Sequence, residues 1–179
     1  MRKLQPGDAA PDFIFQTPWS GPQRFHETAA GKPSLLLFLR YLGCPVCQME
    51  MARLKAGIHL FEAEQAGVFV VLQSMPETVA ASANEADWPF TIVCDPEGDI
   101  FSRYGVAPGG LRYLHPAGMA AAIKATVKGF RHGRFEGKET QLPAVFGIDP
   151  KHRIISLYYG RHPADIPSPE NMAAMLPTR

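Results

Sequence analysis

Short apolar runs, each of a length that suits a buried strand, recur along this chain. Residues 35–39, 68–72 and 89–94 are such runs, and residues 142–148 form a fourth run that is entered through a proline. Residues 153–159 alternate between apolar and polar positions after a turn, which predicts the antiparallel hairpin partner of the fourth run. These five segments are the expected strands of a central sheet.

Helical patterns separate the expected strands. Apolar residues at helical spacing follow the first strand and predict a helix that ends near residues 66–67. Strands that alternate with helices imply crossover connections and a largely parallel central sheet, so the expected fold class is α/β. The residues that support the first helix are Met49, Leu54, Ile58, Leu60 and Phe61. Further helices are expected at about residues 73–86, up to Gly105, at residues 115–127 and near residues 169–176.

Two short strands, at residues 12–16 and 24–27, are expected to form an N-terminal β extension that caps the sheet. The chain has no internal repeat, and residues 1–179 are expected to form a single domain. Residues 111–138 are the expected insertion before the last hairpin, because an Ala-rich helical stretch is followed there by a basic, Gly-punctuated loop.

The first expected strand leads directly into a Cys-x-x-Cys sequence, Cys44-Pro45-Val46-Cys47, where a helical pattern begins. The first turn of a helix has unpaired backbone N–H groups and the positive end of the helix dipole, so the pKa of a thiol there falls. We therefore expect Cys44 to be the attacking sulfur and Cys47, one turn later and more buried, to be the resolving sulfur. Pro45 suits the first helical position, where its missing N–H costs nothing.

The overall composition is that of a soluble globular protein, with 46% hydrophobic and 20% charged residues. A net charge of +1 gives no general argument for a nucleic acid or a membrane as partner. No apolar run approaches the length of a membrane span, and no apolar stretch of a secretory signal follows the basic start of the chain. Three cysteines without a disulfide framework favour a reducing compartment, and we expect the cytoplasm.

The cysteine pair has three interpretations: a redox pair, part of a zinc site, or two inert core residues. Structural zinc usually takes four Cys or His ligands in two pairs, whereas this chain offers one pair and Cys94. We therefore expect redox chemistry with no metal and no cofactor. Cys94 ends an apolar run and is expected in the core.

Four residues near the cysteines are candidates for supporting roles. Arg40 either turns toward Cys44 and lowers its pKa or faces solvent. Tyr41 either donates a hydrogen bond to a bound substrate or packs in the core, and Gly43 forms the turn that ends the strand. Glu50 is expected to be solvated, with proton transfer to the resolving sulfur as the alternative.

Positive charge concentrates in the expected insertion. We expect a solvated surface there, and the docking of an acidic substrate or partner is the alternative. Too few aromatic residues accompany these charges for a nucleic-acid platform. The residues concerned are Lys124, Lys128, Arg131, His132, Arg134 and Lys138.

The order of the elements is similar to the thioredoxin-like fold: a strand ending in Cys-x-x-Cys, two crossover units, then a proline-led hairpin. Pro6-Gly7-Asp8-Ala9-Ala10-Pro11-Asp12-Phe13 looks like the start of peroxiredoxins, and residues 94–106 resemble a segment from the middle of their fold. Residues 40–47 resemble the peroxiredoxin-like branch of the alkyl hydroperoxide reductase/thiol-specific antioxidant (AhpC/TSA) family. The resemblance covers nearly the whole chain and implies a central mixed sheet flanked by helices.

Two positions depart from the pattern of typical peroxiredoxins. Those proteins have a Thr three residues before the peroxidatic Cys, where this chain has Tyr41 before Cys44. They also have an Arg just before the strand that ends in Ile-Asp, and the matching position lies near Pro143. The Thr and Arg hold a peroxide and stabilise its departing oxygen, so their absence favours disulfide exchange, whereas the resemblance favours peroxide reduction.

Pro143 itself resembles the cis-proline that thioredoxins place opposite their Cys-x-x-Cys. A cis bond there would bring backbone close to the sulfurs and offer a docking edge to a substrate disulfide.

The resemblance implies an oxidoreductase that reduces small peroxides or disulfides through Cys44 and an intramolecular disulfide with Cys47. A thiol electron donor of the thioredoxin or glutathione type would then restore the dithiol. A binding or regulatory module that keeps the fold without turnover is the alternative, and assembly as a homodimer is left open.

Overall fold

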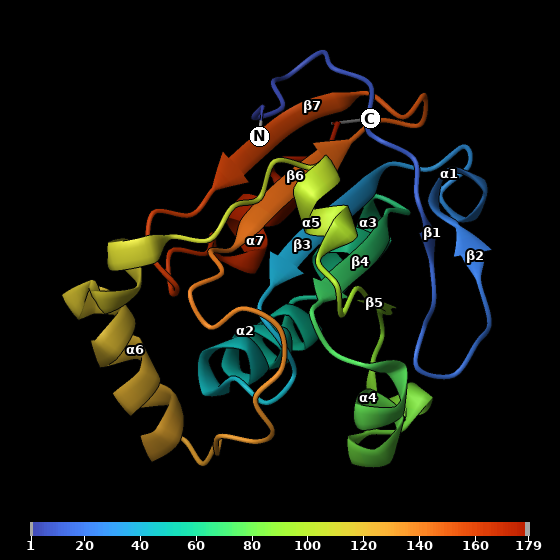
Figure 1. The fold of residues 1–179 in the computed structure, drawn as a ribbon. Helices are drawn as coiled ribbons and strands as arrows, with labels where there is room; N and C mark the ends of the chain where they lie inside the picture. Colours follow the sequence, from blue (N-terminus) through green and yellow to red (C-terminus); the bar gives the residue numbers. More distant parts are fainter. Residues whose placement is uncertain (1, 178–179) are drawn as a thin grey trace.

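A five-stranded mixed sheet lies at the centre of the computed structural model, which describes residues 2–177 (Figure 1). The strands, in the order in which they lie side by side, are β5 (Thr91–Cys94), β4 (Gly67–Leu72), β3 (Ser34–Leu39), β6 (Ala144–Ile148) and β7 (Ile154–Tyr159). β3, β4 and β5 are parallel, whereas β6 pairs antiparallel with both β3 and β7. The five expected strands and the mixed α/β sheet are confirmed, with strand ends within two residues of the prediction.

β3 is buried along its whole length because both faces of the sheet are covered. Leu35, Leu37 and Leu39 point into one core, and Leu36 and Phe38 point into the other. A continuous apolar run, rather than an alternating one, is what a strand covered on both faces requires. The residues that follow β3 therefore emerge at the carboxyl edge of the three parallel strands.

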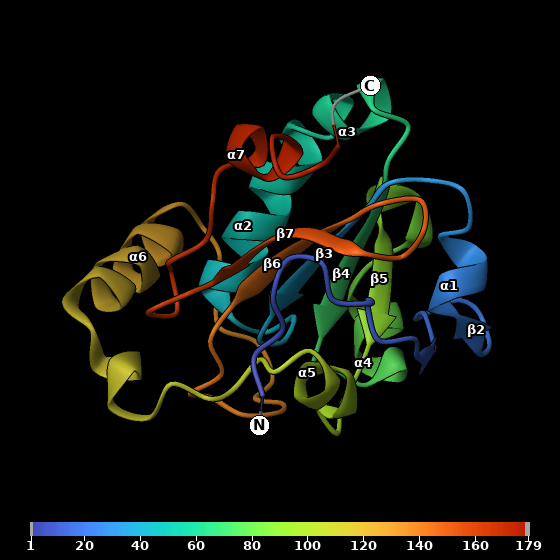
Figure 2. The same cartoon turned by 90° about the horizontal axis from the view of Figure 1, so that it is seen from above.

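Helices cover both faces of the sheet, as the view from above in Figure 2 shows. The helices are α1 (Phe25–Thr28), α2 (Pro45–Ala56), α3 (His59–Ala63), α4 (Pro76–Ser82), α5 (Asp99–Arg103), α6 (Pro116–Val127) and α7 (Pro169–Ala173), with 3₁₀ turns η1 (Glu85–Asp87) and η2 (Gly110–Leu114). α2, α3, α6 and α7 pack on the face that contains Leu37, and α1 and α5 pack on the other face. Within residues 2–177, no helix has both the length and the apolar character that crossing a membrane needs.

Two predicted elements differ because tertiary contacts decide their ends. A strand was expected at residues 24–27, but only Arg24 belongs to a strand, β2 (Gln23–Arg24), and α1 begins at Phe25. The helix forms there because Phe25 is fully buried and stacks on Phe13. The long helix expected after the cysteines breaks at Gly57, the C-cap of α2. An added Cβ on Gly57 would lie 2.7 Å from the Cβ of Pro169, so the approach of α7 fixes this position as glycine.

The helix expected at residues 73–86 is also shorter than predicted. It begins at Pro76, whose missing N–H suits the first turn, and it ends at Ser82. η1 follows, and Asn84 and Asp87 cap it reciprocally. The short polar side chains of this region favour caps over a continuing helix.

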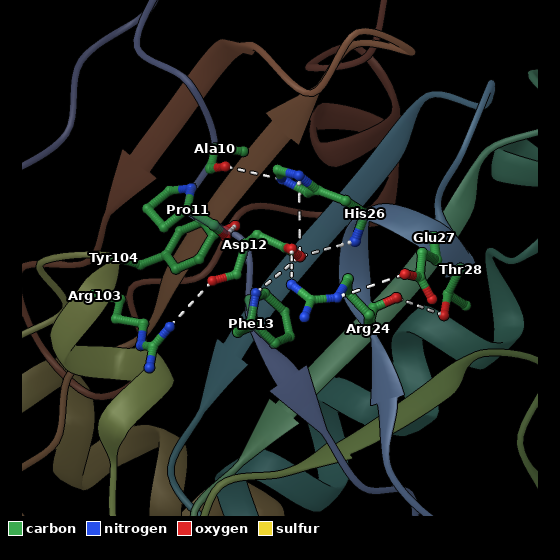
Figure 3. Close-up of polar contacts among 10 residues, drawn as sticks. All are labelled: Ala10, Pro11, Asp12, Phe13, Arg24, His26, Glu27, Thr28, Arg103 and Tyr104. Atoms are coloured by element: carbon green, nitrogen blue, oxygen red, sulfur yellow. Dashed lines mark hydrogen bonds and ion pairs between the residues drawn. The ribbon is translucent and has the colours of Figure 1, made fainter.

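The N-terminal β extension is confirmed: β1 (Ile14–Phe15) pairs antiparallel with β2. Asp12 forms hydrogen bonds with residues of β2, α1 and α5 (Figure 3). Its carboxylate accepts hydrogen bonds from Arg24 at 2.7 Å and from the backbone N–H of His26 at 3.1 Å, and its carbonyl accepts one from Arg103 at 3.2 Å. Burial by itself would raise the pKa of Asp12, but the hydrogen bonds from Arg24 and His26 outweigh it and lower that pKa.

Replacing Asp12 with Asn should lower the free energy of unfolding by about 1 kcal/mol at pH 7, because the carboxylate loses its charged partner. Since the folded-state pKa of Asp12 is lowered, this stabilisation is present above the unfolded-state pKa of about 4 and disappears as the pH falls through the folded-state value. Urea unfolding of both proteins between pH 7 and pH 2 measures the difference. Glu97→Gln at an exposed turn is the control, and equal stability of D12N and the parent at pH 7 would contradict the assignment.

Candidate active site

The two cysteines lie where β3 hands over to α2, as the sequence predicted. Cys44 is the N-cap residue of α2, and its Sγ accepts a hydrogen bond from the backbone N–H of Cys47 at 3.3 Å. Pro45 occupies the first turn of the helix. The unpaired N–H groups and the positive end of the dipole at an N-cap stabilise an anionic sulfur.

Arg40 is buried beside the cysteines, although it is charged. Its Nη2 lies 2.8 Å from the Sγ of Cys44, and its Nη1 donates to the carbonyl of Glu139 at 2.8 Å and to the carboxylate of Glu139 at 3.1 Å. The guanidinium also lies over the rings of Tyr41 and Tyr113, 5.7 and 5.3 Å from their centroids. Of the two orientations left open by the sequence, the structure therefore has Arg40 turned toward Cys44.

Glu139 reaches this group from far along the chain. Besides Arg40, its carboxylate accepts hydrogen bonds from the hydroxyl of Tyr41 and, at 3.2 Å, from the hydroxyl of Tyr113. Tyr41 is fully buried, and its hydroxyl also lies 3.1 Å from the Nε2 of His132. Burial and the hydrogen bond to Glu139 raise the pKa of Tyr41, so the phenol remains a donor.

These contacts separate the protonation states of the two cysteines. The hydrogen bond from the Cys47 thiol is the strongest influence on the pKa of Cys44; burial opposes it, and the positive charge of Arg40 reinforces it, so that the pKa falls to about 6. Burial and the hydrogen bond to Cys44 raise the pKa of Cys47. At neutral pH the pair therefore contains one thiolate, on Cys44, and one thiol, and the two are not joined in a disulfide.

Residues 129–139, which we name the strap, cross over this junction (Figure 1). The backbone N–H of Gly133 donates to the carbonyl of Gly43 at 2.8 Å, and Gln48 Nε2 donates to the carbonyl of Arg131 at 3.1 Å. Further along the strap, the backbone N–H of Lys138 donates to the side chain of Gln73 at 2.8 Å. The exposed fraction of Cys44 beneath this cover is 0%.

Gly43 is the point of closest approach between the strap and the cysteine turn. An added Cβ there would collide with the backbone carbonyl of Arg134, and an added Cβ on Gly133 would lie 3.1 Å from the Cα of Gly43. Two glycines are therefore needed for the strap to lie flat on the junction. Gly43, which the sequence suggested only as a turn residue, is what allows the site to be covered.

Pro143 lies outside this hydrogen-bonded group. All peptide bonds between residues 2 and 177 are trans, so the cis bond expected before Pro143 is wrong. Its carbonyl accepts the backbone N–H of Gly160 at 2.9 Å, and its ring packs against Gly160. The expectation that Pro143 faces the two cysteines rested only on its resemblance to the cis-proline of thioredoxins.

Glu50 is not solvated as expected. Its exposed fraction is 5%, because α6 packs beside α2. Its carboxylate pairs with Arg53 of the same helix at 2.8 Å. Cys94 is buried in the core, as predicted, and burial raises its pKa to about 12. Within residues 2–177, no three or more His, Cys, Asp or Glu side chains are grouped so that they could hold a metal ion.

The sequence did not reveal Glu139, Tyr113 or the role of the strap. The one available signal is that Glu136 and Glu139 are the only acidic residues between Asp99 and Asp149. An acidic residue in a basic segment often has a specific partner, but nothing local identifies Arg40 as that partner. The contact joins residues 99 positions apart.

Comparison with solved structures shows the same fold in several proteins. A peroxiredoxin-like protein from Aquifex aeolicus has a TM-score of 0.70 at 18% identity, with 97% of this chain and 86% of that chain covered. Peroxidoxin BcpB from Mycobacterium tuberculosis has a TM-score of 0.65 at 14% identity, with 96% of each chain covered. A thiol peroxidase from Chromobacterium violaceum has a TM-score of 0.64 at 14% identity, with 97% and 87% covered. The thioredoxin-like fold is thereby confirmed.

Sequence comparison gives the family. No curated protein matches the chain, whereas residues 6–157 match the AhpC/TSA family. This match spans most of the chain, including β3, the cysteine pair and the strap. The chain therefore belongs to the AhpC/TSA family and is an oxidoreductase.

Proposed function

We propose that this protein reduces hydroperoxides, with Cys44 as the attacking thiolate and Cys47 as the resolving thiol. The observation that carries the proposal is the contact of 2.8 Å between Arg40 Nη2 and a fully buried Cys44 Sγ. The guanidinium stabilises the thiolate and offers N–H groups to an oxygen that leaves with negative charge. It would replace the Arg that typical peroxiredoxins have near the position of Pro143.

The proposed cycle uses two electrons per peroxide. The Cys44 thiolate attacks one oxygen of ROOH, the O–O bond breaks, and Cys44 becomes a sulfenic acid while the alkoxide takes up a proton and leaves as ROH. The Cys47 thiol then attacks the sulfenic sulfur, and its proton leaves with the hydroxyl as water when the disulfide forms. An external dithiol, or two thiols, supplies two electrons and two protons to restore the pair.

The enclosure of the site favours a peroxide over a protein disulfide as the oxidant. Cys44 has no exposed surface beneath the strap, and Cys47 is only 3% exposed. A molecule as small as a peroxide needs a modest local opening, whereas the backbone that flanks a protein disulfide requires displacement of the strap. The Cys-x-x-Cys sequence still supports disulfide exchange as the second candidate function.

The proposed cycle needs a thiol donor and a reducing compartment. We propose a donor of the thioredoxin or glutathione type, because the product is a dithiol-reducible disulfide. The three free thiols fit the cytoplasm. Since both sulfurs of the pair are buried, reduction of the disulfide requires the strap to move.

Stopped-flow mixing of the reduced protein with hydrogen peroxide tests the proposal. Oxidation of Cys44 should be at least about 100-fold faster than that of a free thiol of the same pKa, because donors are already placed for the departing oxygen. Cys47→Ser should accumulate a sulfenic acid on Cys44 and lose turnover. Its first step should slow, since the thiol that lowers the pKa of Cys44 is gone, but should not be abolished, since Arg40 remains. Cys94→Ser is the matched control. A rate no faster than that of a free thiol would reject the peroxidase, and a sulfenic acid that forms on Cys47 in Cys44→Ser would reverse the roles.

The pH dependence of Cys44 alkylation should report its thiolate. Iodoacetamide labelling should rise with a midpoint near pH 6, because the thiol loses its proton there. Arg40→Met should move the midpoint upward by at least about one pH unit and slow the peroxide reaction by about 100-fold. Lys55→Met removes a positive charge from α2 away from the sulfur and should change neither value. An unshifted midpoint near pH 8.5 in the parent protein would instead favour a module without turnover.

Gly43→Ala should displace the strap, because the new Cβ meets the Arg134 carbonyl. The peroxide rate should fall about tenfold or more as the ordered site loosens, while reaction with a bulky aromatic disulfide reagent should become faster. Gly21→Ala, where an added Cβ meets nothing within 4 Å, is the matched control. A slower reaction with both reagents would show that the strap does not limit access to Cys44.

A further inference from the structure

The near-neutral charge of the whole chain conceals a strongly basic segment. Residues 100–135 contain six Arg and Lys residues and no Asp or Glu, although the chain as a whole carries 17 acidic residues. The segment forms part of α5, η2, α6 and the start of the strap. A single-sign field of this kind attracts an anionic surface.

Exposed apolar side chains concentrate in the same segment. Six of the nine large hydrophobic residues that residues 2–177 expose belong to it. Scattered exposed apolar residues are ordinary in a soluble protein, whereas a contiguous apolar patch marks an interaction surface. These residues are Leu111 at 88% exposure, Leu114 at 63%, Met119 at 58%, Ile123 at 66%, Val127 at 82% and Phe135 at 67%.

α6 has apolar residues on two sides, and only one of these sides packs against the rest of the molecule. Gly118 and Ala125 are buried and face the body of the molecule, where α6 packs beside α2. Met119, Ile123 and Val127 recur every four residues and form one exposed stripe. In Figures 1 and 2 α6 lies at one end of the molecule, away from the sheet. An apolar face of a helix normally packs against another element, so we expect this stripe to have a binding partner.

We infer that this stripe and its flanking cations dock on a membrane surface rich in anionic lipids. Ile123 and Val127 of the stripe are aliphatic and Lys124 borders it, whereas protein interfaces depend mainly on Trp, Tyr and Arg and are poor in Lys. Lys124 is exposed and neighbours Val127 at a spacing of three residues, and exposed Lys128 follows Lys124 one turn later, on the side of α6 toward Glu50. Long lysine side chains place their charges at the headgroup level while an apolar face enters the acyl boundary.

Charge also argues against a second copy of this chain as the occupant. α6 and Lys128 carry two lysines and no acidic residue, so two copies paired symmetrically on this stripe would bring like charges together. An anionic lipid surface instead compensates Lys124 and Lys128. The inference is independent of the peroxide chemistry, because docking requires neither cysteine.

Co-sedimentation with vesicles tests the inference. The full chain should bind vesicles of phosphatidylglycerol and phosphatidylcholine at low salt, bind pure phosphatidylcholine at least about tenfold more weakly, and lose affinity as salt rises. The double variant Ile123→Glu/Val127→Glu, at two exposed positions, should weaken binding about tenfold or more. Ile14→Glu, at a position 63% exposed on β1, is the matched control and should bind like the parent.

A second pair of variants tests the charge separately. Lys124→Glu/Lys128→Glu should weaken binding to the anionic vesicles, and Lys151→Glu at an exposed turn should not. Three results would overturn the inference: no binding of the parent to anionic vesicles, equal binding to neutral vesicles, or an equal loss in Ile14→Glu. Sedimentation equilibrium would also overturn it if the parent were a dimer that Ile123→Glu/Val127→Glu dissociates, since the occupant would then be a second copy.

Discussion

The contact between the Arg40 guanidinium and the Cys44 sulfur is the interaction on which the rest of the site depends. A buried charge is costly unless it is paired, and here the cation and the thiolate compensate each other. The second anion, Glu139, binds the other side of the same guanidinium and so attaches the strap to the turn that carries Cys44. The lowered pKa of Cys44 and the attachment of the strap therefore both depend on one ion cluster.

The source of the cation distinguishes this chain from the pattern of typical peroxiredoxins. There the Arg stands just before a later strand, whereas here the guanidinium comes from the end of β3, four residues before Cys44. The conformation of one short turn then sets the distance between cation and sulfur. Tyr41 stands where a Thr is typical, and its hydroxyl is committed to Glu139. A larger side chain at this position therefore supports the cover of the site from within.

Residues 111–139 combine two surfaces with different requirements. The strap needs glycine and hydrogen bonds to lie flat on the cysteine turn, whereas α6 needs small residues inside and tolerates large apolar residues outside. α6 continues directly into the strap, so the two surfaces are adjacent in the chain. Both lie beside α2, which carries the cysteines at its first turn and packs against α6 along its side.

The sequence by itself determined the α/β class, the five strands and the position of Cys44 at a helix N-cap, because these follow from side-chain periodicity and local backbone chemistry. It misplaced α1 and the end of α2, since contacts with Phe13 and Pro169 decide them. Only the tertiary structure decided that Arg40 turns inward, that Glu139 meets it and that Gly133 lies on Gly43. The contacts of Glu139 and Gly133 join residues about 90 or more positions apart, and the contact of Glu139 holds Arg40 against Cys44. No local pattern states which of many polar side chains will meet once the chain is packed.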